Sequence, residues 1–272
     1  MGREPKLLVV VGKKGCGKTF TTTKMLQSYV AGNPSRGVSG RRVLILDVND
    51  EFTQVPALAI QNVPLFSVHS RIEMRRIRPF TDDNKKMTLD DIANTLFFIL
   101  QNYKNGLLLI EDINKYISDS MPNDLIGAIC TNRHVGVDII IHYQSIGRIT
   151  SKVWQNLNII RMHKITDAVK RHKHKFEDKY EYFSIAELII EDEYEKGNKR
   201  FFLYVDVDDE VVYGAFKKEA YENAVVKFIQ INYKQLINPL LNARNEKGSR
   251  IYTAQTAIEY VRTRLMRHYK GA

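Results

Sequence analysis

The feature that most constrains this chain is an eight-residue motif near its N-terminus. An apolar run, residues 7–11, is followed directly by Gly12-Lys13-Lys14-Gly15-Cys16-Gly17-Lys18-Thr19, which fits the pattern GxxxxGK[ST]. In this pattern the apolar run is a buried strand, and the glycines allow backbone N–H groups to point at phosphate oxygens. A helix begins near the Lys-Thr pair and adds its positive N-terminal dipole. The motif therefore predicts a strand, a phosphate-binding loop and a helix in an α/β domain.

The residues of this motif have distinct predicted roles toward ATP. Lys18 is predicted to bridge the β- and γ-phosphates, and Thr19 to offer its hydroxyl to Mg²⁺. The rest of the predicted ATP-binding set is Gly12, Lys13, Lys14, Gly15, Cys16, Gly17 and, directly after the motif, Phe20. A chance Gly-rich turn would not explain Lys and Thr at the required offset. A thiol at a helix N-terminus can be reactive, but Cys16 is more simply read as a small residue at a variable position.

A second candidate site segment is an apolar run, residues 107–110, that ends in Glu111 and Asp112. An apolar strand ending in acids is the Walker B pattern. The first acid is predicted to lie near Mg²⁺ and the second to polarise the attacking water. The usual order is Asp then Glu, so which of the two is the general base stays open. The alternative is that both acids simply cap the strand and begin a turn.

A third segment is the apolar run 137–142, which lies between Arg133 and Gln144. Gln144 follows the end of this predicted strand, at the sheet edge where open α/β folds bind ligands, and its amide can orient water or sense the γ-phosphate. Arg133 lies at the opposite end of the strand and is too far from its own nucleotide. It could act in trans as an arginine finger, or it could be a solvated side chain.

Short apolar runs alternate with longer amphipathic stretches along the chain, which is typical of a mostly parallel sheet covered by helices. Predicted strands are 7–11, 43–47, 107–110, 137–142 and 158–162, and predicted helices are 18–30, 89–101, 122–133 and 167–179. Residues 201–207 and 211–216 predict a hairpin, followed by a helix, a turn at 245–249 and a basic helix. We expect a P-loop ATPase domain over residues 1–216 and a C-terminal helical extension over 217–272.

Charge and cysteine content limit the possible partners and compartment. The chain has 41 Lys and Arg against 31 Asp and Glu, a net charge of +10, which suits a polyanion but also fits an ordinary basic protein. Dense basic stretches at 170–175 and 262–270 could touch a phosphate backbone or be solvated helix faces. Two cysteines cannot form a disulfide framework, and no apolar run reaches the roughly 18 residues of a membrane span. A cytoplasmic protein is the expectation.

The three segments together resemble the HerA/FtsK branch of P-loop ATPases, most of all the small genome-packaging ATPases of tailless double-stranded DNA viruses. Residues 43–52, an apolar strand that ends in Asp47 and is followed by Glu51-Phe52, are similar to a further segment of that family. Residues 133–145 and 158–162 look like its next two strands. The resemblance covers about residues 7–162 in the family's order.

This resemblance implies a RecA-like core, a ring that is commonly hexameric, and ATP-driven movement of double-stranded DNA. It assigns Arg133 the role of the trans arginine and Gln144 that of the sensor. The implied partners are double-stranded DNA, bound through its backbone without sequence preference, further copies of this chain, and a capsid or portal vertex protein. If the protein is viral, the implied location is the host cytoplasm or a virion vertex.

Two alternatives to genome packaging remain at this stage. The first keeps the DNA translocase but places it in conjugation or DNA-end processing. The second is a Zot-like P-loop ATPase that acts in assembly without moving DNA.

Overall fold

The computed structural model describes residues 4–81, 83–113, 127–129 and 135–271. It divides into two compact units, Met1–Ile160 and Arg161–Ala272, which are described separately below. The chain is an α/β protein whose sheet strands are mostly parallel, with one antiparallel pair near the C-terminus.

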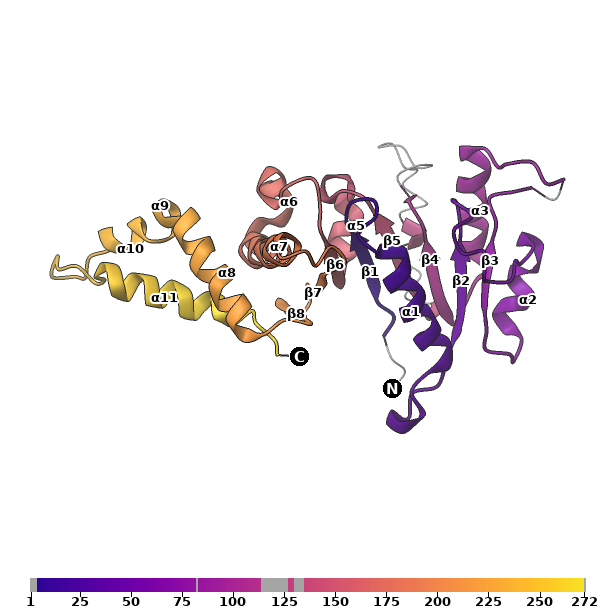
Figure 1. The fold of residues 1–272 in the computed structure, drawn as a ribbon, viewed down its shortest axis with the longest axis horizontal. Coiled ribbons are helices and arrows are strands. Elements are labelled where there is room, and N and C mark those ends of the chain that lie inside the picture. The colour runs from indigo at the N-terminus through magenta and orange to yellow at the C-terminus, as the bar shows by residue number, and fades with distance from the viewer. Residues whose placement is uncertain (1–3, 82, 114–126, 130–134, 272) are drawn as a thin grey trace. The chain divides into compact units, whose positions relative to one another are not determined.

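The first unit is built on five parallel strands (Figure 1). They are β1 (Leu7–Val11), β2 (Arg42–Leu46), β3 (Met74–Ile77), β4 (Gly106–Ile110) and β5 (Val137–Tyr143), in the order β3-β2-β4-β5-β1. All residues of β1, β4 and β5 are buried, as expected for parallel strands covered on both faces. The four strands predicted here are confirmed. β3 was not predicted, because two of its four residues (MRRI) are arginines and it therefore lacks an apolar run.

Helix α1 (Lys18–Ala31) covers one face of this sheet. Leu26 of α1 packs in one cluster with alternate residues of β1, β2 and β4: Leu8, Val10, Val43, Ile45, Leu107 and Leu109. Alternate residues of a strand point to the same face, so this cluster fixes α1, and the loop before it, against the strands that carry the other predicted site residues.

The first unit contains further helices and 3₁₀ turns. They are α2 (Val63–Val68), α3 (Leu89–Asn102) and α5 (Ser151–Asn156), with 3₁₀ turns η1 (Pro34–Arg36), η2 (Ile60–Asn62) and η5 (Ile146–Arg148). The predicted helix at 89–101 is confirmed, and Thr88 and Asp91 form its capping box. Of the helix predicted at 122–133, only residues 127–129 are described, and these are helical.

The second unit begins in β6 (Ile159–His163) and continues through several helical pieces. These are η6 (Val169–His172), α6 (Lys173–Phe176), η7 (Glu177–Lys179) and α7 (Tyr180–Glu195). The prediction of one helix over 167–179 is wrong. Glu177 takes a positive φ of 48° and interrupts the helix, and the basic run before it offers no continuous apolar face. The long helix starts only at Tyr180, where apolar residues recur.

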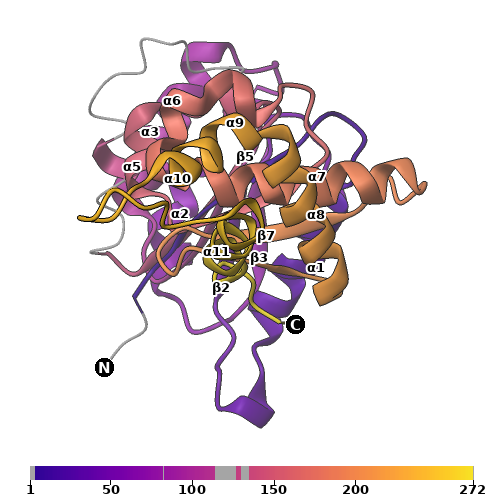
Figure 2. The same ribbon diagram turned by 90° about the vertical axis from the view of Figure 1, so that its left-hand side faces the viewer.

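The predicted hairpin is confirmed as β7 (Phe202–Asp206) and β8 (Val211–Gly214), which pair antiparallel. The helices α8 (Lys218–Ile231), α9 (Tyr233–Leu236), α10 (Asn238–Asn242) and α11 (Ala254–Met266) follow (Figure 2). The predicted turn at 245–249 is also confirmed, because the N–H of Asn245 donates to the carbonyl of Ser249 at 2.9 Å. The domain boundary after residue 216 stays a prediction. Within the described residues, no helix is both long and apolar enough to cross a bilayer.

Candidate functional site

The loop between β1 and α1 has the backbone that the motif predicts. Gly15 and Gly17 have φ values of 79° and 89°, which L side chains rarely adopt. Gly17 is also the N-cap residue of α1, and no side chain caps that end of the helix. The first N–H groups of α1 are therefore not capped by a side chain at the predicted phosphate site.

Lys18 folds back over this loop. Its Nζ donates to the carbonyl oxygen of Gly12 at 2.5 Å and to that of Lys13 at 3.0 Å. The ammonium group thus lies against the backbone of the loop, and its role toward the phosphates stays a prediction. Phe20, in the first turn of α1, is 53% exposed and lies under the ammonium of Lys24.

Thr19 contacts a residue that was not predicted to belong to the site. Its Oγ1 donates to Oε2 of Glu51 at 3.2 Å. Glu51 lies just beyond the end of β2, and β2 is separated from β1 by β4 and β5 in the sheet. The Glu51-Phe52 pair after β2 is visible in the sequence. It follows a strand of the same parallel sheet, and this could have identified Glu51 as a site residue.

Asp47, the residue directly after β2, holds the Glu51 segment in position. Its carboxylate is fully buried and accepts the backbone N–H groups of Glu51 at 2.9 Å and Phe52 at 3.0 Å. Arg76 of β3 pairs with Asp47 at 2.7 Å and also binds Asp50. A buried carboxylate with this many donors keeps one orientation, so the backbone at Glu51 is fixed.

The predicted acid pair follows β4 as expected. Glu111 is 2% exposed, and Asp112 takes a positive φ of 42°. Asn49 donates to Oδ2 of Asp112 at 3.1 Å, and Nε2 of Gln144 lies 3.4 Å from both Asp112 carboxylate oxygens. β5 pairs with both β1 and β4, so Gln144, just past its end, belongs between the phosphate loop and the acid pair.

The electrostatics of this edge are dominated by acids. The pKa of Glu111 is raised to about 8, first by burial and then by the nearby charges of Glu51, Asp47 and Asp112, while a hydrogen bond from Asn49 opposes the shift. Carboxylates gathered this closely favour a cation among them. Burial also raises the pKa of the Cys16 thiol, with Lys18 opposing, which favours a packing role for Cys16 over a reactive one.

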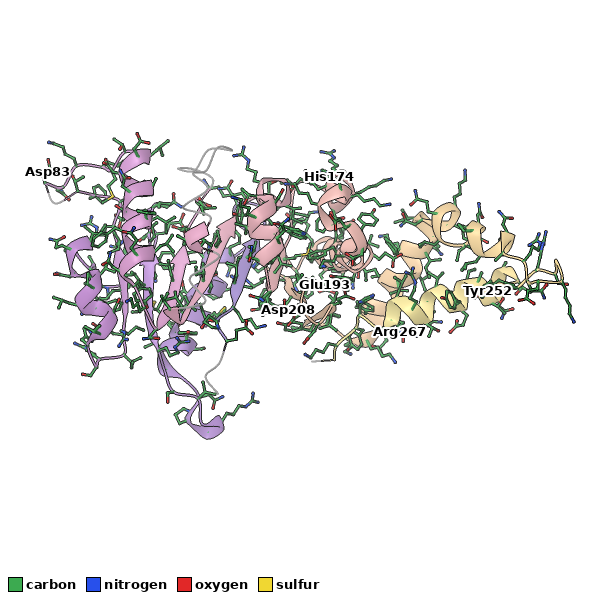
Figure 3. All side chains as sticks on the ribbon, turned by 180° about the vertical axis from the view of Figure 1, so that it is seen from behind. Asp83, His174, Glu193, Asp208, Tyr252 and Arg267 are labelled. Carbon is green, nitrogen blue, oxygen red and sulfur yellow. The ribbon has the colours of Figure 1, made fainter. Side chains whose placement is uncertain are left out.

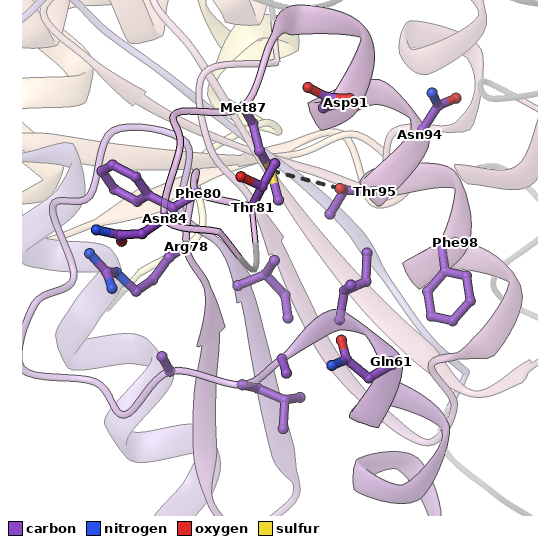
Figure 4. A pocket seen from close by; sticks show the side chains of 15 residues that line it. Gln61, Arg78, Phe80, Thr81, Asn84, Met87, Asp91, Asn94, Thr95 and Phe98 are labelled. Atoms are coloured by element: carbon purple, nitrogen blue, oxygen red, sulfur yellow. Dashed lines mark hydrogen bonds between the residues drawn. The ribbon is translucent and has the colours of Figure 1, made fainter.

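One predicted residue and one cavity stand apart from this cluster. Arg133 lies outside the described residues. A cavity of about 720 Å³ opens between α3 and the segments at 57–61 and 77–87 (Figure 4). Phe80, Met87 and Phe98 line it, and none of its lining residues belongs to the phosphate loop or to the acid cluster.

No family model matches the chain, and no curated protein matches it. Solved structures do. The genome packaging NTPase B204 of Sulfolobus turreted icosahedral virus 2 in complex with AMPPCP aligns at 16% identity and a TM-score of 0.49, over 76% of this chain and 95% of that one. The N-terminal domain of zonular occludens toxin from Neisseria meningitidis aligns at 12% identity and a TM-score of 0.37, over 58% and 76%. EssC from Geobacillus thermodenitrificans aligns at 14% identity and a TM-score of 0.36, over 62% and 34%.

The structural match to B204 is to a protein of the kind that the sequence resembles, a viral genome packaging NTPase. B204 has also been solved with ATP-gammaS, so this structural neighbour is an NTPase that binds ATP analogues. Because the identities and TM-scores are low, the functional proposal below rests on the residues of this chain.

Proposed function

We propose that this protein is an ATPase that uses ATP hydrolysis to move double-stranded DNA, as a viral genome-packaging motor does. One observation carries the ATPase assignment. Residues that follow β1, β2, β4 and β5 meet at one edge of the sheet: the hydroxyl of Thr19 contacts Glu51, and Gln144 contacts Asp112 beside Glu111. Open parallel sheets bind ligands at this edge.

Each of these side chains has a proposed role. The N–H groups of the loop, residues 12–19, and of Phe20 hold the phosphates, and Lys18 neutralises charge that develops as the terminal phosphate leaves. Asp112 takes the proton of the attacking water, and Gln144 orients that water. Glu51, held by Asp47, positions the hydroxyl of Thr19.

The donor set also fits Mg²⁺, which prefers oxygen ligands. Thr19 and Glu111 would hold the ion, with Glu51 close to Thr19. When bound, Mg²⁺ supplies positive charge to the phosphates. Its binding would also relieve the repulsion from neighbouring acids, which adds to burial in raising the pKa of Glu111.

The assignment of DNA as the moved partner rests on two weaker supports. The net charge of +10 suits a polyanion, and the order of motifs resembles the packaging ATPases. On this proposal the working unit is a homo-oligomeric ring, commonly a hexamer, in which Arg133 of one subunit completes the site of its neighbour and the ring docks on a capsid or portal vertex.

Steady-state ATP hydrolysis with and without long double-stranded DNA, at low and moderate salt, tests the proposal. We expect DNA to raise turnover, and added salt to weaken this effect because the contacts are to phosphates. Hydrolysis that requires Lys18 but ignores DNA would favour the Zot-like assembly function instead.

A further inference from the structure

Several cations of the second unit have acidic partners. Arg264 of α11 lies 2.8 Å from Glu181, and Arg262 lies 3.6 Å from Glu222. Lys270, just after α11, lies 3.9 Å from Asp209. These three charges are partly compensated within the unit.

The loop between α10 and α11, residues 243–253, is different. Arg244, Lys247 and Arg250 are all exposed, and no salt bridge to them is found in the part of the chain that the structure describes. The loop contains one acid, Glu246, so its net charge is +2. The guanidinium of Arg244 donates instead to the backbone carbonyls of Leu241 and Ala243.

The loop is folded as a small, defined turn. Oδ1 of Asn245 accepts the N–H groups of Lys247 at 3.0 Å and Ser249 at 2.9 Å, and Gly248 takes a φ of 78°. Lys247 therefore lies within the turn at a fixed place relative to the two arginines on either side of it.

The two arginines face each other across an antiparallel bridge, Arg244↔Arg250. Residues directly opposite in such a bridge have Cβ atoms about 5 Å apart, and like charges there are destabilising. An opposing pair of arginines with no acid beside it lowers the stability of the free loop. A bound anion would remove that repulsion, and guanidinium groups match phosphate geometry well.

The loop also lies away from the strands of its own unit. The chain just after α11 is fixed to β8 by two backbone hydrogen bonds. The N–H of Val212 donates to the carbonyl of His268 at 2.7 Å, and the N–H of Lys270 donates to the carbonyl of Val212 at 3.1 Å. At 1.5 Å per residue, the start of α11 is about 20 Å from that anchor. Tyr252, labelled in Figure 3, packs against Tyr260 of α11 in a tilted arrangement with ring centroids 5.5 Å apart.

From these observations we infer that the loop of residues 243–253 binds the phosphate backbone of double-stranded DNA through Arg244, Lys247 and Arg250. This inference rests on the proposed DNA-translocating function, and it identifies one surface that the moved duplex contacts. Binding through phosphates carries no sequence preference, in keeping with a motor that must accept any sequence.

The test measures binding of the full-length protein to a labelled random-sequence duplex between about 50 and 200 mM salt. The loop variant is R244Q/K247Q/R250Q. The matched control, K218Q/R262Q/K270Q, removes the same charge from acid-paired cations of the same unit. Each lost phosphate contact should reduce the magnitude of the slope of log K against log salt by roughly 0.9. We therefore expect the loop variant to reduce this magnitude by about 2–3 per bound subunit, and the control variant to change it by less than about 1. Hydrolysis without DNA should be unchanged in both.

The possible failures can be told apart. If the wild-type protein binds DNA but both variants behave alike, the loop inference is overturned and the translocase proposal stands. If the wild-type protein binds no DNA at any salt, both fail. If the loop variant keeps its DNA binding and instead loses binding to vesicles that contain phosphatidylserine, the loop is a membrane contact and the inference is wrong.

Discussion

One ion pair from each compact unit shows two different uses of charge. In the first, Asp47 and Arg76 form an ion pair whose side chains are 0% and 8% exposed, and this pair holds the segment that carries Glu51. In the second, the pair Arg264–Glu181 is 41% and 22% exposed. Buried charges are costly to place and tolerate one arrangement, whereas exposed pairs contribute little. Buried charge therefore marks where this protein needs exact geometry, and exposed charge marks where it needs a surface.

The largest effect should come from the acids at the site edge of the first unit. We expect Asp112→Asn to lower turnover by about 100- to 10,000-fold while nucleotide binding persists, because a general base is lost. Glu111→Gln should instead raise the Mg²⁺ concentration needed for nucleotide binding. Turnover and binding of a fluorescent ATP analogue, measured side by side, separate these roles. The reverse pattern would exchange the two assignments.

Breaking the buried pair should cost the most stability. Arg76→Met leaves the Asp47 carboxylate buried without its cation, which should lower the free energy of unfolding by about 3–5 kcal/mol in urea titrations. The neighbouring Arg75→Met breaks the pair with Glu73, whose side chains are only partly buried at 26% and 16% exposure, and should cost less than Arg76→Met. Equal losses in both variants would remove the contrast between buried and exposed charge.

Lys18→Ala should reduce ATP hydrolysis by about 100- to 1000-fold, the range for loss of one group that stabilises transition-state charge. Lys24→Ala removes the same charge from the exposed face of the same helix and should keep wild-type turnover within about twofold. Near-normal activity of Lys18→Ala would show that the loop does not serve ATP.

Glu187 is a second-unit acid whose ionisation is governed by burial, and it sharpens the comparison. Its pKa is raised to about 7, mainly by burial and also by Glu191 and Asp167, while the N–H of Val169 and the charge of Lys164 oppose the shift. The folded state therefore holds this proton at pH values where the unfolded chain has lost it. Stability from this group is present below about pH 4.5 and is lost as the pH rises to about 7, at up to about 1.4 kcal/mol per pH unit.

Urea unfolding at pH 5 and pH 7.5 checks this titration. We expect Glu187→Gln to remove that part of the pH dependence, and Glu195→Gln, an exposed residue of the same helix, to keep it. Parallel curves for the wild-type protein and Glu187→Gln would mean that Glu187 ionises normally in the folded state.

The smallest effect is expected at the surface of the second unit. Arg264→Gln removes the contact with Glu181 and should cost less than about 1 kcal/mol in the free energy of unfolding. A loss above about 2 kcal/mol would mean that this exposed pair is not screened by solvent, and the contrast between the units would no longer hold.

Much of the first unit could be predicted because its signals are local. Runs such as residues 7–11 and 107–110 are apolar throughout and can hardly be anything but buried strands, and the phosphate loop has a fixed spacing. The strand at 74–77 was not predicted because Arg76 reads as a surface residue. It is buried only because it pairs with Asp47 and Asp50, which lie far from it in the sequence. The helix at 167–179 was wrong because a basic run has no periodic apolar face to fix its boundaries.

The sequence by itself determined the strand, loop and helix at residues 7–31 and the identity of Lys18, Thr19, Glu111, Asp112 and Gln144 as candidate site residues, because spacing along the chain carries that information. Only the tertiary structure decided that Glu51 contacts Thr19, that Asp47 and Arg76 hold it there, and that Arg244 and Arg250 face each other across a turn. The contacts of Glu51 with Thr19 and of Asp47 with Arg76 depend on strand order and register. These bring together residues that lie far apart in the chain, and no local sequence pattern encodes them.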